Sequence, residues 1–308
     1  YMFRREDDNS LKYAEDDGKM IEPIYFVPVV ANVLINGCEG IGTGYKTSIA
    51  NFNPLDVIKV TKQYISDPSK VETILPYYHG FKGTTTEDSS GAITFCGMYN
   101  IKDYKNEIHI TELPPKVWSN VYFDWLHKNS PDYITDMDQK STKEDVLIIL
   151  KYKSGIHIHE KNLIEDLKLS TKITLSQMNL FNYKSNLVKY TSTYEIIEAH
   201  AEIRIKTYKK RLASQIKKTE HDVNLYQEKA RFLQECVDKT IVVAGLLKSN
   251  LKDLLRSKKY IDYDDFKYLT GMEIYMQTKE EVEKMKKMAH DMNEKLTELK
   301  KMTPQKLW

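Results

Sequence analysis

The chain has 308 residues, of which 29% are charged and 41% hydrophobic, with a formal net charge of +2. This length accommodates two domains or one elongated domain, and at least part of it can bury a sizeable core. The longest apolar stretch, Val27 to Ile35, is far shorter than the roughly 18 to 20 residues that span a bilayer, so no membrane segment is expected.

The first residues, YMFRREDD, contain neither an initiator Met nor an apolar signal region, which indicates a chain that begins inside a longer protein. Cys38, Cys96 and Cys236 form no Cys-x-x-Cys pair, and reduced, buried thiols in an intracellular protein are the simplest interpretation. Before Thr191 the sequence holds 22 basic and 25 acidic residues, so nucleic-acid contact there would depend on local geometry rather than on a bulk basic field.

Residues 1–190 mix short β-like runs with Gly, Pro, Asn and Asp, as expected for an α+β region. A helix is predicted to begin at Pro54 after the cap Asn53, and another near Lys116, with Val117, Val121, Trp125 and Leu126 on one side. The predicted strands are Ala92 to Phe95, Glu107 to Glu112, Val146 to Tyr152 and Thr171 to Leu175.

Residues 191–308 show the periodicity of long helices. No Pro or Gly interrupts Thr193 to Lys239, and a continuous helix of 47 residues would be about 70 Å long. Its apolar positions recur at spacings of three and four, which is a heptad pattern; they are Ala201, Ile205, Tyr208, Leu212, Thr219, Val223, Tyr226, Ala230, Leu233 and Val237.

A second heptad pattern follows a capping box formed by Thr278 and Glu281. It contains Val282, Met285, Ala289, Met292, Leu296, Leu299 and Thr303, and it can pair with the first helix as an antiparallel hairpin. The segment between the helices, residues 240–277, has more apolar residues than a turn requires, which favours a contact surface.

One glycine-rich segment carries a family resemblance. The segment IEPIYFVPVVANVLINGCEGIGTGY, residues 21–45, resembles the part of type IIA DNA topoisomerases in which an Asp-Asp motif leads through Glu-Pro and an apolar strand into Asn-Gly-x-Glu-Gly-Ile-Gly-Thr-Gly. The matching residues are Asp7, Asp8, Leu11, Tyr13, Asp16, Asp17, Gly18, Glu22, Pro23, Pro28 and Asn36 to Gly44.

Further matches extend the resemblance over the whole chain. They are Phe81 to Thr84, Ile110 to Pro114, Trp118, Tyr122, Lys168 to Phe181, Thr303, Pro304, Leu307 and Trp308. The resemblance implies an α+β fold, with a mixed α/β tower in residues 1–190, starting with the end of an upstream winged-helix region, followed in residues 191–308 by a long antiparallel coiled coil with a helical dimer-gate tip. Cys38 and Tyr45 depart from the usual Ala and Trp, and they favour a viral enzyme of the asfarvirus kind. The location would then be the host cytoplasm, and a cellular enzyme would be nuclear.

The resemblance gives Ile41 the role of a wedge that enters between base pairs and bends double-stranded DNA, with Gly40, Gly42 and Thr43 also at the DNA. Four glycines in residues 37–44 permit positive φ angles and a close approach to another molecule. From the residues alone, a tight turn with Ile41 in the core is the alternative. A nucleotide-binding loop is disfavoured because no Gly-Lys-Ser/Thr ending follows.

The segment Lys168 to Gln177 resembles a family segment that contacts DNA. Lys168, Ser170, Lys172, Thr174 and Ser176 alternate and can project from one strand face, where cations and hydroxyls suit phosphate oxygens. Thr171 and Gln177 belong to the same matched segment. A solvated strand face is the alternative.

The family forms homodimers, and the dimer gate is assigned to the apolar positions between the two long helices. They are Ile241, Val242, Val243, Leu246, Leu247, Leu251, Leu254 and Leu255. No metal site is predicted: His157, His159 and Glu160 lack further ligands, and Asp7 with Asp8 and Asp16 with Asp17 are interpreted as turn and capping residues.

The resemblance places the nucleophilic Tyr of DNA cleavage upstream of residue 1, so the fragment alone should neither cut DNA nor hydrolyse ATP. It should bind no cofactor itself, while the full-length enzyme would use Mg²⁺ and ATP to pass one duplex through a transient double-strand break. The alternative function is a non-enzymatic coiled-coil adaptor or dimerisation module, which explains the heptads but gives the glycine-rich segment no role.

Overall fold

The protein is described by a computed structural model of residues 2–89, 91–156, 158, 160–273, 276 and 278–308. It divides into two compact units. Unit 1 comprises residues 3–27 with 204–308, and unit 2 comprises residue 2 with 28–203. This division differs from the expected boundary at residue 190, because the segment 3–27 groups with the later part of the long helix.

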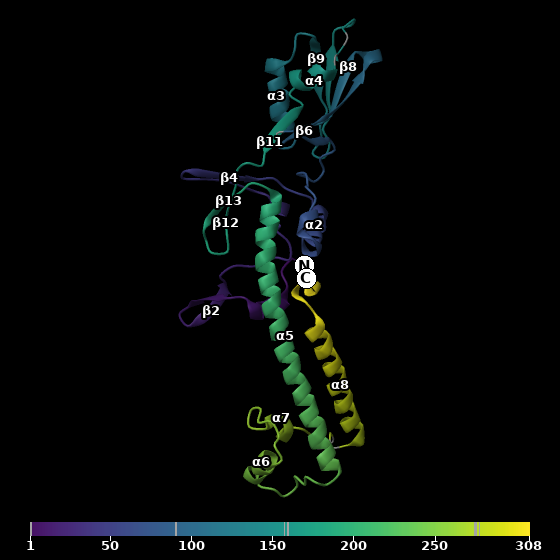
Figure 1. Ribbon diagram of the computed structural model, residues 1–308. Helices are drawn as coiled ribbons and strands as arrows, with labels where there is room; N and C mark the ends of the chain where they lie inside the picture. Colours follow the sequence, from purple (N-terminus) through teal and green to yellow (C-terminus); the bar gives the residue numbers. More distant parts are fainter. Residues whose placement is uncertain (1, 90, 157, 159, 274–275, 277) are drawn as a thin grey trace. The chain divides into compact units, whose positions relative to one another are not determined.

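Unit 2 is a mixed α/β assembly (Figure 1). Its elements are α1 (Asn32–Asn36), β3 (Cys38–Gly42), β4 (Tyr45–Ile49), α2 (Pro54–Ser66), η2 (Pro68–Lys70), β5 (Thr84–Glu87), β6 (Ala92–Cys96), β7 (Met98–Lys102), η3 (Asp103–Lys105), β8 (Glu107–Glu112), α3 (Ser119–Asn129), β9 (Ile134–Gln139), β10 (Ile148–Tyr152), α4 (Glu160–Asp166), β11 (Ser170–Thr174), β12 (Met178–Phe181), β13 (Leu187–Tyr190) and the start of α5 (Thr193–Val237).

The strands of unit 2 form small antiparallel sheets. One sheet has the order β7-β8-β10-β9, another has the order β11-β6-β5, and β3–β4 and β12–β13 are hairpins. The four predicted strands correspond to β6, β8, β10 and β11 to within two residues at each end. The prediction that the apolar stretch before the glycines is a strand is wrong, because residues 32–36 form the helix α1.

Two apolar clusters stabilise unit 2. Ile108, Ile148 and Leu150 of the four-stranded sheet pack with Tyr122 and Leu126 of α3 in one cluster. The other joins α1, α2, the β3–β4 and β12–β13 hairpins and the first turn of α5 through buried residues that include Leu34, Phe52, Val57, Met178 and Ile197.

The prediction that Val117, Val121, Trp125 and Leu126 share one apolar side of a helix is partly wrong. The helix α3 begins at Ser119, so Val117 precedes it, and Val121 faces solvent. Tyr122 takes the inward position, and its hydroxyl donates a 2.6 Å hydrogen bond to the carbonyl of Leu167. Burial raises the pKa of Tyr122 and keeps the hydroxyl protonated.

Unit 1 combines the first residues of the chain with helices. Its elements are η1 (Arg5–Ser10), the hairpin β1 (Tyr13–Asp16) and β2 (Lys19–Pro23), the rest of α5, α6 (Lys248–Ser257), α7 (Lys267–Thr270), α8 (Lys279–Lys301) and α9 (Pro304–Leu307). The long helix predicted from Thr193 is confirmed, ending at Val237, two residues before the expected end.

Within unit 1, α8 runs beside α5 (Figure 1). Ala230 and Leu233 of α5 pack against Val282 and Met285 of α8, while Glu220 forms a 2.7 Å ion pair with Lys300 near the other end of α8. The two helices are therefore antiparallel here. The Thr278 hydroxyl accepts from the Glu281 amide as the capping box predicts, and no helix among the described residues is long and apolar enough to cross a membrane.

Candidate nucleic-acid interface

The glycine-rich segment forms the antiparallel hairpin β3–β4, with Thr43 and Gly44 in the turn. Ile41 pairs with Lys46 and Gly42 pairs with Tyr45. The Ile41 side chain is 87% exposed, so the alternative of Ile41 in the core is wrong. An apolar side chain this exposed beside a turn has no packing role within unit 2 and is available to another molecule.

The glycines of this hairpin have different roles. Gly37 has a φ of +66°, and a Cβ there would lie 2.9 Å from the carbonyl oxygen of Ile49. Gly44 also has a positive φ, whereas Gly40 and Gly42 lie on β3 without one. Of the four glycines expected to permit positive φ angles, Gly37 and Gly44 adopt them.

The hairpin is attached to β12 by two hydrogen bonds. The Ser48 amide donates to the carbonyl of Gln177 at 2.8 Å, and the Asn179 side-chain amide donates to the carbonyl of Lys46 at 2.6 Å. Gln177 thus lies beside the glycine hairpin. Backbone and side-chain bonds together fix the direction in which the hairpin projects.

The strand β11 shows the predicted alternation. Lys172 and Thr174 are exposed, while Ile173 between them is partly buried, and Ser176 continues the exposed series. The hydroxyls of Thr174 and Ser176 lie 3.2 Å apart. Polar groups therefore line one side of this strand, next to Gln177.

Lys168 departs from the predicted strand. It has a φ of +46° and lies two residues before β11, where it ends the turn that follows α4. Its ammonium group lies 4.7 Å from the centre of the Trp125 ring, a cation–π contact that holds the side chain against α3. Lys168 is exposed, although it is not part of the strand row.

An ion pair connects the hairpin to the segment before α3. The Lys116 ammonium lies 2.9 Å from a carboxylate oxygen of Glu39 on β3. The hydrogen bond from Lys116 lowers the pKa of Glu39, and the same bond raises the pKa of Lys116. Both groups remain charged near neutral pH, so each cancels the other's charge at this surface.

Comparison with known proteins identifies the family. The family model for the A-subunit of DNA gyrase/topoisomerase IV matches residues 1–308. The chain belongs to this topoisomerase family. DNA topoisomerase 2 of Arabidopsis thaliana is 29% identical over 358 residues, which cover 100% of this chain and 24% of that protein. DNA topoisomerase 2 of Plasmodium falciparum (isolate K1 / Thailand) is 31% identical over 282 residues, covering 90% of this chain and 20% of the relative.

A solved structure agrees with these sequence matches. The crystal structure of the Plasmodium falciparum topoisomerase II DNA-binding, cleavage and re-ligation domain superimposes with a TM-score of 0.82 at 28% identity, covering 100% of this chain and 46% of that chain. The topoisomerase chain thus corresponds to a part of a type IIA core, and it spans between a fifth and a quarter of the curated relatives above.

The predicted gate residues of the topoisomerase chain separate into two groups. Ile241, Leu251 and Leu255 are buried in a cluster with Phe232, Tyr260, Phe266 and Leu269, and Val243 and Leu254 pack against it. The side chains of Ile241, Leu251 and Leu255 therefore form part of the core of unit 1. Val242, Leu246 and Leu247 are exposed and remain available for a partner.

The Asp residues matched to the family differ in their surroundings. Asp7 was expected in a turn or cap, but its carboxylate is buried and pairs with Arg204 at 2.7 Å and Arg211 at 3.4 Å. Asp17 has a φ of +47° and precedes Gly18 in the β1–β2 turn, as predicted. His157 and His159 lie outside the described residues, and those described contain no cluster of three or more His, Cys, Asp or Glu suited to a metal ion.

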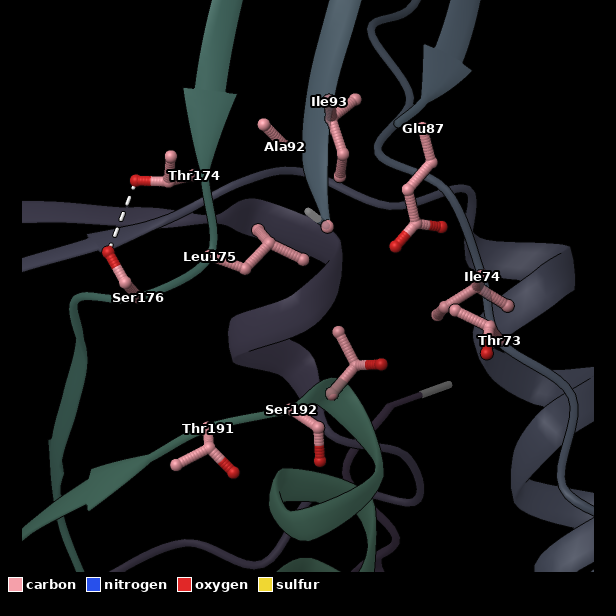
Figure 2. A pocket seen from close by; sticks show the side chains of 12 residues that line it. Thr73, Ile74, Glu87, Ala92, Ile93, Thr174, Leu175, Ser176, Thr191 and Ser192 are labelled. Carbon is pink, nitrogen blue, oxygen red and sulfur yellow. Dashed lines mark hydrogen bonds between the residues drawn. The ribbon is translucent and has the colours of Figure 1, made fainter. Parts of the chain in front are cut away.

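A pocket of about 390 Å³ lies where β6 and β11 approach the first turn of α5 (Figure 2). Polar residues that line it include Thr73, Thr191, Ser192 and Glu87, and Ile93 and Leu175 are among the apolar ones. The described lining contains no His, Cys or Lys.

Sequence reasoning missed several residues of these surfaces. Arg204 and Arg211 are seven residues apart, and that spacing on an apolar helix face was the available signal for their burial. The contacts of Asn179 with Lys46 and of Lys116 with Glu39 join residues 133 and 77 positions apart. Contacts between residues this far apart in the sequence cannot be predicted from a local sequence pattern.

Proposed function

We propose that this chain is the DNA-bending and dimer-gate part of an ATP-dependent type II DNA topoisomerase, which passes one duplex through a transient double-strand break. The names of the relatives support the topoisomerase assignment, and the exposed Ile41 supports the bending role. Inserting an apolar side chain at a base step costs a few kcal/mol of unstacking, which extra contacts with the bent duplex offset.

Fluorescence energy transfer across a short end-labelled duplex tests the wedge. Ile41→Ala should abolish protein-induced bending while leaving the thermal midpoint unchanged, because the side chain makes no core contact. Leu55→Ala is the matched control, since Leu55 is an aliphatic residue of unit 2 that is 73% exposed on α2. Full bending by Ile41→Ala would reject the wedge.

The strand β11 is proposed to bind the phosphate backbone through Lys172, Thr174 and Ser176, with Ser170, Thr171, Gln177 and Lys168 nearby. Cations and hydroxyls read no base sequence, which suits an enzyme that acts on many sites. Lys172→Glu should weaken DNA binding and flatten its salt dependence, while unchanged affinity would count against this assignment.

The tip of unit 1 is proposed as a homodimer gate. Val242, Leu246 and Leu247 offer exposed apolar side chains above a core that Leu251 and Leu255 complete. A self-complementary patch of this kind suits a two-fold contact. Sedimentation of Leu247→Asp should show dissociation without unfolding, and an unchanged mass would reject the patch.

The described residues offer no ligand set for Mg²⁺, and no step is assigned to a metal here. We propose, as the resemblance implies, that Mg²⁺ and ATP serve the full-length enzyme. This chain's own residues then hold and bend the duplex and form the gate.

A further inference from the structure

The two hairpins beside the proposed wedge, β3–β4 and β12–β13, are separate two-stranded sheets that two hydrogen bonds connect, and the four strands together are called the ribbon. Hydrogen bonds connect Ser48 to Gln177 and Lys46 to Asn179. Residue numbers therefore fall along β4 while they rise along β12. The two central strands are therefore antiparallel, as are the strands within each hairpin.

The ribbon has one buried face. Ile49, Met178 and Tyr190 are buried in the core of unit 2, and Leu180 and Val188 pack against the same cluster. Because successive side chains of a strand point to opposite faces, the residues between these positions point outward.

A single row crosses the outward face. Ile41 pairs with Lys46, Lys46 lies beside Asn179, and Asn179 pairs with Lys189. Side chains directly opposite one another on neighbouring strands share a face.

The cations of this row are free to bind an external anion. Lys46 and Lys189 are both exposed, and neither forms an ion pair within the part of the chain that the structure describes. Glu39 lies two residues from Ile41 on β3, hence on the same face, but Lys116 pairs with it. The outward face therefore has two uncompensated positive charges in register with Ile41.

We infer that Lys46 and Lys189 bind backbone phosphates of the same duplex that Ile41 enters, an inference that rests on the proposed bending function. Lysines act as point charges toward phosphates and read no bases. The ribbon then secures the duplex on one side of the wedge, so the cost of unstacking is offset by contacts that form only when the duplex lies along the row.

The test compares two double variants of this chain that lose the same charge. Lys46→Gln/Lys189→Gln removes the row, whereas Lys128→Gln/Lys143→Gln removes two exposed lysines elsewhere on unit 2. Binding of a short fluorescent duplex is measured as a function of salt. Each phosphate contact contributes about 0.9 to the slope of log K against log salt, so the row variant should lose about 1.8.

The control variant should retain the parent slope, and both variants should keep the parent thermal midpoint. An equal loss in both variants, or no loss in the row variant, would overturn the inference. A failure of Ile41→Ala to change bending, with the slope loss still seen, would reject the wedge and keep the phosphate contacts. Lost bending in Ile41→Ala together with an unchanged salt slope in the row variant would support the wedge and reject the phosphate contacts.

Discussion

The guanidinium of Arg204 on α5 lies 2.7 Å from the carboxylate of Asp7 in η1, and both side chains are buried. The same guanidinium donates to the carbonyl of Val27 at 2.9 Å and lies 4.2 Å from the centre of the Tyr208 ring. Tyr208 stacks in turn on Trp308. These contacts join the first and last residues of unit 1 to the long helix.

Asp7→Asn should destabilise unit 1 strongly. The substitution removes the carboxylate that pairs with the buried guanidinium of Arg204 and leaves Arg211 with Glu6 alone, at 3.7 Å. Breaking a buried pair from one side costs about 3–5 kcal/mol. Urea denaturation measures the change in the free energy of unfolding. The control Asp8→Asn alters an exposed carboxylate and should change it by less than about 0.5 kcal/mol. Equal effects of the two variants would contradict the role of Asp7.

Gly37 should tolerate Ala far less well than Gly40. At Gly37 a Cβ would meet the Asn51 Oδ1 at 2.8 Å and a backbone carbonyl at 2.9 Å, with φ at +66°. With ψ at 174°, this backbone conformation is essentially restricted to glycine and costs an L-residue about 1–3 kcal/mol. At Gly40 the nearest atom is a methyl carbon of Thr47 at 3.8 Å, which is an ordinary contact. Thermal unfolding of both variants should show a lower midpoint for Gly37→Ala, and similar midpoints would refute this difference.

In the segment between the two long helices of unit 1, buried residues should affect stability and exposed residues should affect self-association. Leu255 is fully buried, and Leu255→Ala should cost about 2–5 kcal/mol locally. Hydrogen exchange at the amides of Leu269 and Thr270 reports this loss, because both amides donate to the carbonyl of Phe266. Leu247→Ala removes a side chain that is 69% exposed, and it should leave exchange unchanged while weakening self-association. Faster exchange in Leu247→Ala would contradict the division between core and surface.

Much of the fold was predictable because its signals are local. The cap Asn53, the cap Thr278 and the long helix from Thr193 depend on residues within one or two turns, and all three were confirmed. The exposure of Ile41 followed from the family resemblance and was also confirmed.

The failures arise where tertiary packing overrides local pattern. Residues 32–36 are apolar enough for a strand, but Leu34 is buried against α2 as part of a short helix. Apolar count alone also cannot separate Ile241, Leu251 and Leu255, which are buried in unit 1, from the exposed Val242, Leu246 and Leu247. The partner of Asp7 is 197 residues away, and a single sequence contains no sign of that distance.

Glu39→Gln should strengthen DNA binding. The substitution removes a carboxylate from the outward face of the ribbon and releases the ammonium of Lys116, which Glu39 now holds at 2.9 Å. One more free cation should steepen the salt dependence by about 0.9. The hydrogen bond from Lys116 lowers the pKa of Glu39, so the carboxylate is charged at neutral pH and the full effect should be seen there.

A matched control for Glu39→Gln exists on the same unit. Glu72→Gln breaks a similar exposed pair, with Lys59 at 2.7 Å, at a site away from the ribbon, and should leave the salt dependence unchanged. Because exposed pairs contribute little to folding, both variants should keep the parent thermal midpoint. Weaker binding by Glu39→Gln at an unchanged midpoint would mean that the pair itself orients the hairpin for DNA. The charge argument for this face would then be wrong.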